Sequence, residues 1–137
     1  MKDKLLVICG PTATGKTKMA ADLARQLGGE LVSADSRQVY RGMDIGTGKD
    51  VSETIGVPLW MIDVVNPNEE FSVRQYASLA TAVIGDIRKR GKLPIIVGGT
   101  GLYIHALINP IDTLNIPPDQ HLRDELNRLS VEELQKR

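Results

Sequence analysis

Residues 10–17 have the sequence GPTATGKT, which matches the pattern G-x-x-x-x-G-K-[ST]. A continuous apolar run at residues 5–9 precedes this segment, and a helical pattern at residues 17–27 follows it. A short apolar run that stops at a glycine is typical of a strand buried on both faces in a parallel sheet. A strand, a glycine-containing loop and a helix in this order place successive backbone N–H groups around a phosphate. The motif therefore predicts an α/β fold built around phosphate binding.

Two side chains of the motif have predictable chemical roles. Lys16 is expected to neutralise the terminal phosphates, and the Thr17 hydroxyl is expected to hold Mg²⁺. A chance match in a glycine-rich turn has a frequency on the order of one in a few hundred for a chain of this length. The predicted phosphate-binding residues are Gly10, Pro11, Thr12, Ala13, Thr14, Gly15, Lys16 and Thr17.

The rest of the chain alternates between strand and helix patterns. Further strands are expected at residues 30–34, 59–65 and 93–97, and further helices at residues 73–90 and 102–108. Ser72 and Gln75 form a capping box at the start of one helix, and Gly91 ends it. Strands that alternate with helices predict parallel pairing and right-handed crossovers. The predicted fold is α/β, a P-loop NTPase-like three-layer fold with a parallel sheet that is incomplete at the C-terminus.

Helical periodicity also predicts which side chains face the core. Met19, Leu23 and Leu27 share one stripe of the first helix. In the long helix the expected apolar face consists of Val73, Tyr76, Ala77, Ala80, Val83, Ile84 and Ile87.

The C-terminal segment has a different character. A charged helical stretch is expected at residues 120–129, and Ser130 and Glu133 form a second capping box four residues before the end. A helix that short is marginal in water, so we expect the sequence to be cut inside a larger protein. Residues 1–110 are predicted to form the phosphate-binding core, and residues 111–137 to begin a helical insertion.

Composition adds broad limits on the class of protein. Lysine plus arginine and aspartate plus glutamate each number 17, so the formal net charge is zero and carries no signature of nucleic-acid binding. A local basic patch remains compatible with this balance. Cys9 is the only cysteine and is expected to be a small buried hydrophobe in a reduced compartment. No apolar run is long enough for a signal peptide or a membrane span, so a soluble cytoplasmic protein is expected. The sequence does not determine the oligomeric state, and a monomer is the expected one.

Asp35 is the candidate for acid–base chemistry. It follows the second predicted strand, at the sheet edge where open α/β proteins bind ligands. A carboxylate there can act as a general base, cap a turn or serve as a secondary Mg²⁺ ligand. The following residues Ser36, Arg37 and Gln38 suit recognition of a nucleobase or form an ordinary polar loop. Thr100, in a Gly-Gly-Thr-Gly turn, can reach a ligand or cap a helix.

Other candidates for chemistry are weaker. Asp63 formally qualifies as the acidic strand end that many P-loop proteins use, and a structural role is an equal alternative. His105 and His121 have no partners at metal-ligand spacing. Tyr103 and Trp60 are expected to pack rather than to stack on a ligand.

Residues 10–17, 34–49 and 94–103 together resemble the tRNA dimethylallyltransferases, also called tRNA isopentenyltransferases. The second and third segments are ADSRQVYRGMDIGTGK and PIIVGGTGLY, which are more specific than the P-loop itself. The resemblance covers most of residues 5–108. Leu59 and Trp60 stand where the family usually has a histidine pair.

This resemblance implies transfer of a dimethylallyl group from dimethylallyl diphosphate to the exocyclic amine of the adenine beside the tRNA anticodon. It implies Mg²⁺ and the diphosphate at the P-loop, Asp35 as the catalytic base, and residues 111–137 as a truncated helical tRNA-binding insertion. The residues implied to contact tRNA are Asp35, Ser36, Arg37, Gln38, Thr100 and Arg123. Residues 1–137 alone are expected to be inactive. Two alternatives remain, a P-loop kinase of a small metabolite or nucleotide, and a truncated phosphate-binding fragment without catalysis.

Overall fold

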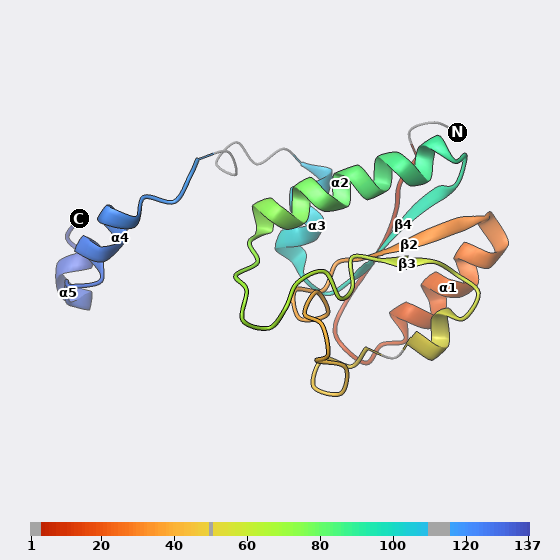
Figure 1. Ribbon diagram of the computed structural model, residues 1–137, viewed down its shortest axis with the longest axis horizontal. Coiled ribbons are helices and arrows are strands. Elements are labelled where there is room, and N and C mark those ends of the chain that lie inside the picture. The colour runs from red at the N-terminus through yellow and green to blue at the C-terminus, as the bar shows by residue number, and fades with distance from the viewer. Residues whose placement is uncertain (1–3, 50, 110–115) are drawn as a thin grey trace.

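The computed structural model describes residues 4–49, 51–109 and 116–137. Strands and helices alternate through most of the chain (Figure 1), which confirms the predicted α/β class. In chain order the elements are β1 (Leu6–Cys9), α1 (Lys16–Leu27), β2 (Gly29–Ser33), the short 3₁₀ helix η1 (Val51–Thr54), β3 (Leu59–Trp60), α2 (Val73–Lys89), β4 (Leu93–Gly98), α3 (Gly101–Ile108), α4 (Gln120–Leu126) and α5 (Val131–Leu134).

The four described strands form one parallel sheet in the order β1-β4-β2-β3. Ile95 of β4 pairs with Leu6 of β1 on one side and with Leu31 of β2 on the other. The strands that precede the P-loop and Asp35 are therefore separated by β4. Since all strands are parallel, the loops after β1, β2 and β4 emerge at the same edge of the sheet.

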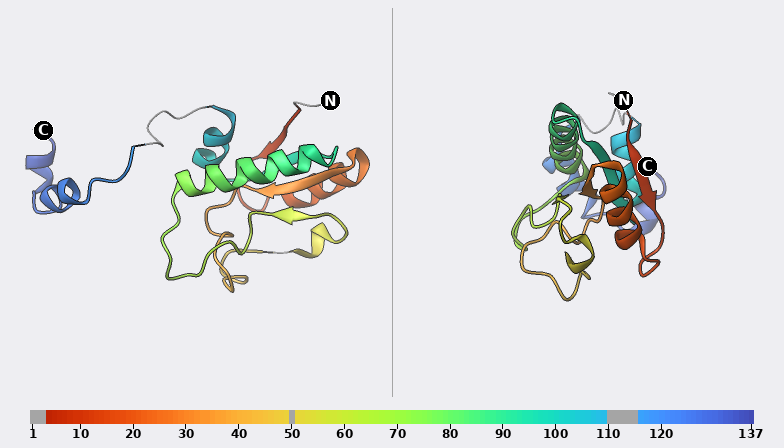
Figure 2. Two further views of the ribbon diagram at one scale, coloured as in Figure 1. Left: turned by 45° about the horizontal axis from the view of Figure 1, so that its top comes forward. Right: turned by 90° about the vertical axis from the view of Figure 1, so that its right-hand side faces the viewer.

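Helices cover both faces of the sheet, which confirms the three-layer prediction (Figure 2). Successive residues of β4 point to opposite faces, as the strand period of two requires. Ile95 and Val97 pack with α1, and Ile96 packs with α2 and α3. The expected apolar face of α2 is confirmed, since Tyr76, Ala80, Ile84 and Ile87 are buried. The predicted capping box between Ser72 and Gln75 is also present.

The predicted core stripe of α1 is wrong. Its buried residues are Ala20, Ala21 and Ala24, whereas Met19 and Leu27 are 58% and 54% exposed. Small side chains let the helix backbone lie close to the sheet, which leaves no room there for leucine or methionine. The stripe of Met19, Leu23 and Leu27 is displaced around the helix from the buried face, and Leu23 is half-buried.

The predicted strand at residues 59–65 is also wrong beyond Trp60. Met61 and Asp63 adopt left-handed backbone angles, with φ of 64° and 53°, and such residues cannot continue an extended strand. Farther along, Val65 forms an isolated parallel bridge with Tyr40, which lies outside the four-stranded sheet.

β1 lies at an edge of the described sheet, and its residues are only partly buried. Val7 packs against one core cluster and Leu6 and Ile8 pack against the other, so both faces of β1 are covered, though less completely than predicted. Cys9, at its end, is exposed rather than buried. The remaining boundaries differ from the predicted ones by a few residues, as helix and strand ends commonly do.

α4 and α5 contribute no residue to either core cluster and contain no buried residue (Figure 1). The predicted capping box between Ser130 and Glu133 is present. The predicted helix at residues 120–129 ends at Leu126. Pro110 and residues 111–115, where the predicted core meets the predicted insertion, lie outside the described residues. Within the described ranges, no helix combines the length and apolar character needed to cross a bilayer.

Candidate functional site

The P-loop wraps between the end of β1 and the start of α1. Ala13 and Gly15 have φ of 62° and 76°, and these left-handed angles turn the backbone tightly around the loop. Gly15 is the N-cap of α1 and, having no side chain, forms no side-chain cap hydrogen bond. The first turn of α1 also lacks acidic residues. Its N–H groups and the positive end of the helix dipole thus suit an anion.

Lys16 folds back across this loop. Its Nζ donates a hydrogen bond to the Pro11 carbonyl oxygen and lies 3.5 Å from Thr14 Oγ1. Thr14 Oγ1 donates to the same carbonyl at 2.9 Å. The ammonium is therefore held directly beside the loop backbone that would surround a phosphate.

The P-loop and Asp35 line the same cleft, which has a volume of about 490 Å³. Its walls come from the P-loop, from the ends of β2 and β4, from the segment between β2 and β3, and from β3 and the residues that follow it. The lining residues are Thr12, Ala13, Thr14, Gly15, Lys16, Thr17, Ser33, Asp35, Gln38, Thr47, Gly48, Lys49, Val51, Glu53, Leu59, Ile62, Val97, Gly98 and Gly99.

Of the three roles predicted for Asp35, the structure shows one, the capping of a turn. Its Oδ1 accepts a hydrogen bond from the Arg37 backbone N–H at 2.9 Å, so the carboxylate caps the turn after β2. Among the described residues this is its only hydrogen-bond donor. The same side chain lines the cleft with the P-loop. Capping therefore fixes the carboxylate without using up its capacity to accept a proton.

The predicted tRNA-contacting residues do not all reach the cleft. Gln38 lines it, and Gln38 Oε1 accepts a hydrogen bond from Ser33 Oγ at 3.2 Å. Thr100 Oγ1 instead accepts from the Ser36 backbone N–H at 2.9 Å, which ties the loop after β4 to the loop after β2. The side chain of Arg37 is exposed outside the cleft.

Arg123 lies on α4, beyond the residues that form the core, and it is not brought to the cleft. The roles assigned to these residues from the sequence stay predictions.

The glycines at the end of β4 permit the close packing of the two loops. A Cβ atom on Gly98 would lie 2.3 Å from the Ala34 carbonyl oxygen, and one on Gly99 would lie 3.4 Å from the Gly10 carbonyl oxygen. The end of β4 thus lies close to the backbone of Ala34 after β2 and to the backbone of Gly10 after β1. Gly98 and Gly99 themselves place no side chain between the P-loop and Asp35.

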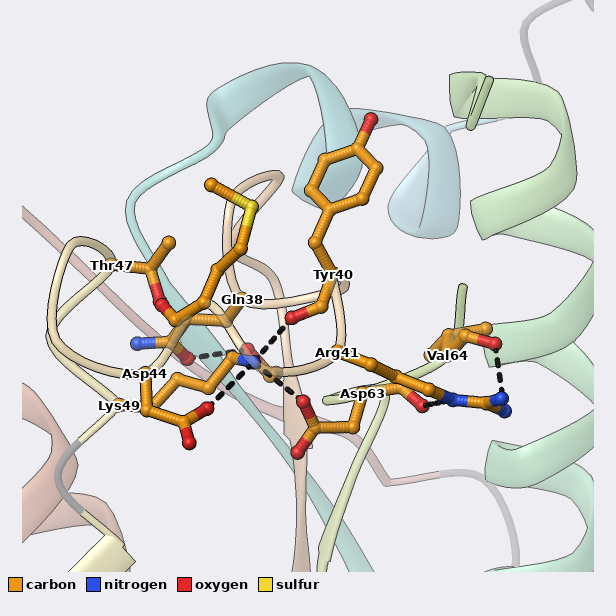
Figure 3. A network of polar contacts seen from close by, with 10 residues as sticks. Gln38, Tyr40, Arg41, Asp44, Thr47, Lys49, Asp63 and Val64 are labelled. Atoms are coloured by element: carbon orange, nitrogen blue, oxygen red, sulfur yellow. Dashed lines mark hydrogen bonds and ion pairs between the residues drawn. The ribbon is translucent and has the colours of Figure 1, made fainter. Parts of the chain in front are cut away.

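Sequence reasoning missed Lys49 and the segment around it. Its side chain is 3% exposed, and its Nζ contacts Asp63 Oδ1 at 2.5 Å and Asp44 Oδ1 at 3.2 Å (Figure 3). Burial alone would lower the pKa of Lys49, but the hydrogen bonds to Asp63 and Asp44 outweigh it and raise the pKa. Asp63 follows β3 and lies 14 residues from Lys49 in the sequence. The Lys49–Asp63 ion pair therefore becomes visible only in the folded chain. Asp63 is therefore an ion-pair partner and does not line the cleft.

Leu59 and Trp60 depart from the expected histidine pair, and Trp60 has a structural role here. Trp60 Nε1 donates to Glu30 Oε2 at 2.8 Å, and the Arg90 guanidinium lies 5.9 Å from the centre of the Trp60 ring. Hydrogen bonds from Arg90, and to a lesser degree from Trp60, hold the pKa of Glu30 below its ordinary value despite burial. Tyr103 is buried and stacks on Tyr76 with ring centres 3.9 Å apart, so it packs as predicted, whereas Trp60 is 40% exposed and belongs to neither core cluster.

The donor set at the cleft suits a metal ion shared with phosphate oxygens. Within the described residues, no group of three or more His, Cys, Asp or Glu side chains gathers to hold a metal alone. The Thr17 hydroxyl and the Asp35 carboxylate do line the same cleft. Mg²⁺ commonly takes only one or two protein oxygens and completes its shell with phosphate and water.

Two family models match the sequence. The model described as IPP transferase matches residues 38–137, and the model described as isopentenyl transferase matches residues 3–59. The chain belongs to the IPP transferase family. The resemblance expected from the three motif segments is thereby confirmed.

Similar proteins of the IPP transferase family are considerably longer. The chain is 50% identical over 137 residues to tRNA dimethylallyltransferase 1 of Geotalea uraniireducens (strain Rf4), covering 100% of this chain and 46% of that relative. The crystal structure of the full-length tRNA isopentenylpyrophosphate transferase from Bacillus halodurans matches with a TM-score of 0.79 and 48% identity, over 97% of this chain and 46% of that one. A eukaryotic dimethylallyltransferase acting on tRNA matches with a TM-score of 0.76 and 32% identity, over 96% and 31% of the two chains. The chain thus spans less than half the length of these relatives.

Proposed function

We propose that this chain is the phosphate-binding part of a tRNA dimethylallyltransferase. The proposed enzyme transfers a dimethylallyl group from dimethylallyl diphosphate to the exocyclic amine of the adenine next to the tRNA anticodon. The observation that carries the proposal is the shared cleft, in which a phosphate loop and the Asp35 carboxylate face one space of about 490 Å³. The reaction needs one site for a diphosphate leaving group and one for a proton acceptor.

In this proposal the P-loop binds the diphosphate. The uncapped N–H groups at the start of α1 and the Lys16 ammonium stabilise the negative charge that grows as the leaving group departs. Thr17 is the proposed protein ligand of Mg²⁺, which would supply further positive charge to the diphosphate oxygens.

Asp35 is the proposed general base. The amine nitrogen of the adenine forms a bond to the allylic carbon, and the bond from that carbon to the diphosphate oxygen breaks. The nitrogen then carries an excess proton, which passes to the Asp35 carboxylate. The hydrogen bond from the Arg37 N–H holds this carboxylate at the cleft without consuming its second oxygen.

The proposed acceptor is an adenine turned out of its stack, because a base inside a stacked loop cannot enter the cleft. Gln38 offers its amide to that base, while Ser36, Arg37, Thr100 and Arg123 are proposed to contact the RNA. Residues 111–137 are proposed as the start of a helical tRNA-binding insertion. The proposed reaction takes place in the cytoplasm.

The decisive experiment uses the complete gene product in two reactions. In the first, it receives Mg²⁺, dimethylallyl diphosphate and an anticodon stem-loop carrying the target adenine. The expected result is an increase in the mass of the RNA by one dimethylallyl group. In the second, it receives ATP with candidate metabolites and nucleotides, and no ADP should form. ADP without prenylated RNA would establish the kinase alternative instead.

A further inference from the structure

The ammonium of Lys49 has a full set of acceptors although it lies in a mainly exposed segment. Residues 41–46 around it are exposed, yet the Lys49 side chain is 3% exposed. Its Nζ donates to the Tyr40 carbonyl oxygen, to Asp44 Oδ1 and to Asp63 Oδ1. An ammonium group has three donors, so these three acceptors satisfy it completely. Such a buried and saturated cation specifies one arrangement of the chain around it.

Lys49 joins two segments that are far apart in the sequence. Tyr40 and Asp44 belong to the segment after β2, whereas Asp63 follows β3 (Figure 3). Asp63 adopts a left-handed φ of 53°, which the surrounding contacts must hold in place.

Backbone hydrogen bonds continue the contact on either side of Asp63. The Asp63 N–H donates to the Gln38 carbonyl oxygen at 3.1 Å, and the Val64 N–H donates to the Val39 carbonyl oxygen at 2.7 Å. The Arg41 side chain donates from Nε to the Asp63 carbonyl oxygen at 2.8 Å. The Lys49–Asp63 ion pair therefore sits at the centre of a clamp that holds residues 38–41 against residues 63–65.

This clamp shares residues with one wall of the cleft. Gln38 is inside both the clamped segment and the cleft lining, and Asp35 lies three residues before it. Thr47, Gly48 and Lys49 add to the same wall. The P-loop makes none of the clamp contacts, since its lysine and threonine bond within their own loop. Loosening the clamp should therefore displace Asp35 and Gln38 and leave the phosphate cradle in place.

We propose that Lys49 is a positioning residue, which acts with Asp63 to fix the wall that carries Asp35 and Gln38. It sets the geometry of the acceptor and the base rather than the affinity for the diphosphate. The catalytic part of this inference rests on the proposed prenyl transfer, whereas the structural part does not.

The test uses Lys49→Met in the complete gene product, because methionine keeps the approximate length and apolar stem and removes the charge. We expect kcat for prenyl transfer to fall by about 10- to 100-fold, as misplacement of reacting groups by about 1 Å can cost. The KM for dimethylallyl diphosphate should stay within about twofold, because KM reports ground-state binding when chemistry is slow. Lys89→Met, which removes an exposed lysine from the end of α2, is the matched control and should leave both parameters unchanged.

Hydrogen exchange gives a readout that does not depend on catalysis. In Lys49→Met the amides of Arg41, Val64 and Val65, which donate across the clamp, should exchange faster than in the parent. Amides of β4 should be unaffected. Asp63→Asn, which retains an oxygen acceptor and tolerates the left-handed conformation, should have a smaller effect than Asp63→Ala.

Two results would overturn the proposal. One is weaker diphosphate binding with unchanged turnover, which would make Lys49 a direct ligand of the substrate. The other is unchanged exchange at Arg41, Val64 and Val65, which would show that no clamp exists. Absence of prenyl transfer in the parent protein would instead count against the proposed function, and the exchange result would still decide the clamp.

Discussion

Single residues in this cleft act through backbone geometry as well as through their functional groups. Asp35 both caps the turn that Arg37 enters and lines the cleft. Lys16 lies against the carbonyl of Pro11, within the loop whose shape depends on left-handed angles at Ala13 and Gly15. A substitution at either functional residue therefore needs to be chosen so that it separates chemistry from shape.

For Lys16, alanine makes that separation, because the loop's turns depend on Ala13 and Gly15 rather than on the lysine side chain. We expect Lys16→Ala to weaken binding of dimethylallyl diphosphate by about 10- to 100-fold, which is the loss expected for a hydrogen bond to a charged group. Calorimetric titration measures the affinity, and the melting temperature serves as a control for folding. Unchanged affinity would remove the P-loop from the mechanism.

For Asp35, asparagine is the sharper substitution, because its side-chain oxygen can still accept the hydrogen bond from the Arg37 N–H. Asp35→Asn keeps the turn and removes the base, so the single-turnover rate should fall by about a hundred- to ten-thousand-fold. RNA binding should change little. If instead the rate is normal and RNA binding is weakened, Asp35 belongs to recognition.

At the scale of elements, the end of β4 determines how closely the loops after β1 and β2 approach each other. Gly98 lies against the Ala34 backbone, and the Ala34 N–H donates to the Val97 carbonyl oxygen at 2.8 Å. The Thr100 N–H returns to the Ala34 carbonyl oxygen at 3.0 Å. Backbone hydrogen bonds from the end of β4 and from the loop after it therefore hold Ala34, the residue that precedes Asp35.

Gly98→Ala should disrupt this contact, because the added Cβ would lie 2.3 Å from the Ala34 carbonyl oxygen and must push the backbone away. We expect the free energy of unfolding to fall by about 1–3 kcal/mol, as overpacked sites commonly do. Gly101→Ala is the matched control, since its added methyl group would meet no atom within 4 Å beyond the local backbone and it sits in the first turn of α3. Urea denaturation of both variants measures the difference, and equal stabilities would contradict the steric argument.

Much of this element pattern follows from local sequence, and the failures have identifiable causes. The P-loop, the capping box at Ser72 and the strand that became β4 depend on neighbouring residues, so the sequence predicts them. The position of β4 between β1 and β2 depends on long-range pairing that no local pattern reports. The break after Trp60 requires left-handed angles at Met61 and Asp63, which carry no glycine to signal them. Lys49 was missed because its partner lies beyond another strand.

At the scale of the whole molecule, one buried carboxylate links three elements. Glu30 of β2 accepts hydrogen bonds from Trp60 of β3 and from Arg90 at the end of α2. Arg90 also reaches back to Asp86 at 2.9 Å. This cluster lies at the opposite end of the sheet from the cleft, because Glu30 stands near the start of β2 and Asp35 follows its end. It joins the elements without taking part in the chemistry.

Glu30 should therefore make the free energy of unfolding depend on pH in the acidic range. Its pKa in the folded protein lies below the ordinary value of 4.5, chiefly because Arg90 donates to it, so its contribution is complete above pH 4.5. That contribution is lost as the pH falls through the lowered pKa, because the unfolded chain binds the proton first. Glu30→Gln should cost about 1–2 kcal/mol at pH 7, allowing for partial solvation of Arg90. The difference in the free energy of unfolding between Glu30→Gln and the parent should become smaller toward pH 3, because Glu30 of the parent is then increasingly protonated.

Melting temperatures at pH 7, 5 and 3 measure this dependence. Glu70→Gln, at an exposed glutamate, is the control and should behave like the parent at each pH. A constant difference between Glu30→Gln and the parent across the three values would contradict the assigned linkage.

The sheet order has a consequence for synthesis on the ribosome. β1 has β4 as its only neighbour in the described sheet, and Leu6 pairs with Ile95. At ordinary translation rates the chain between these two residues takes roughly 5–20 s to make. During that interval β1 has no strand to pair with, although β2 can already form contacts with β3 and α1. β1, which precedes the phosphate loop, is thus made before the other described strands but cannot pair until β4 has been made. The time for which β1 stays unpaired in the nascent chain is therefore set by the rate of translation.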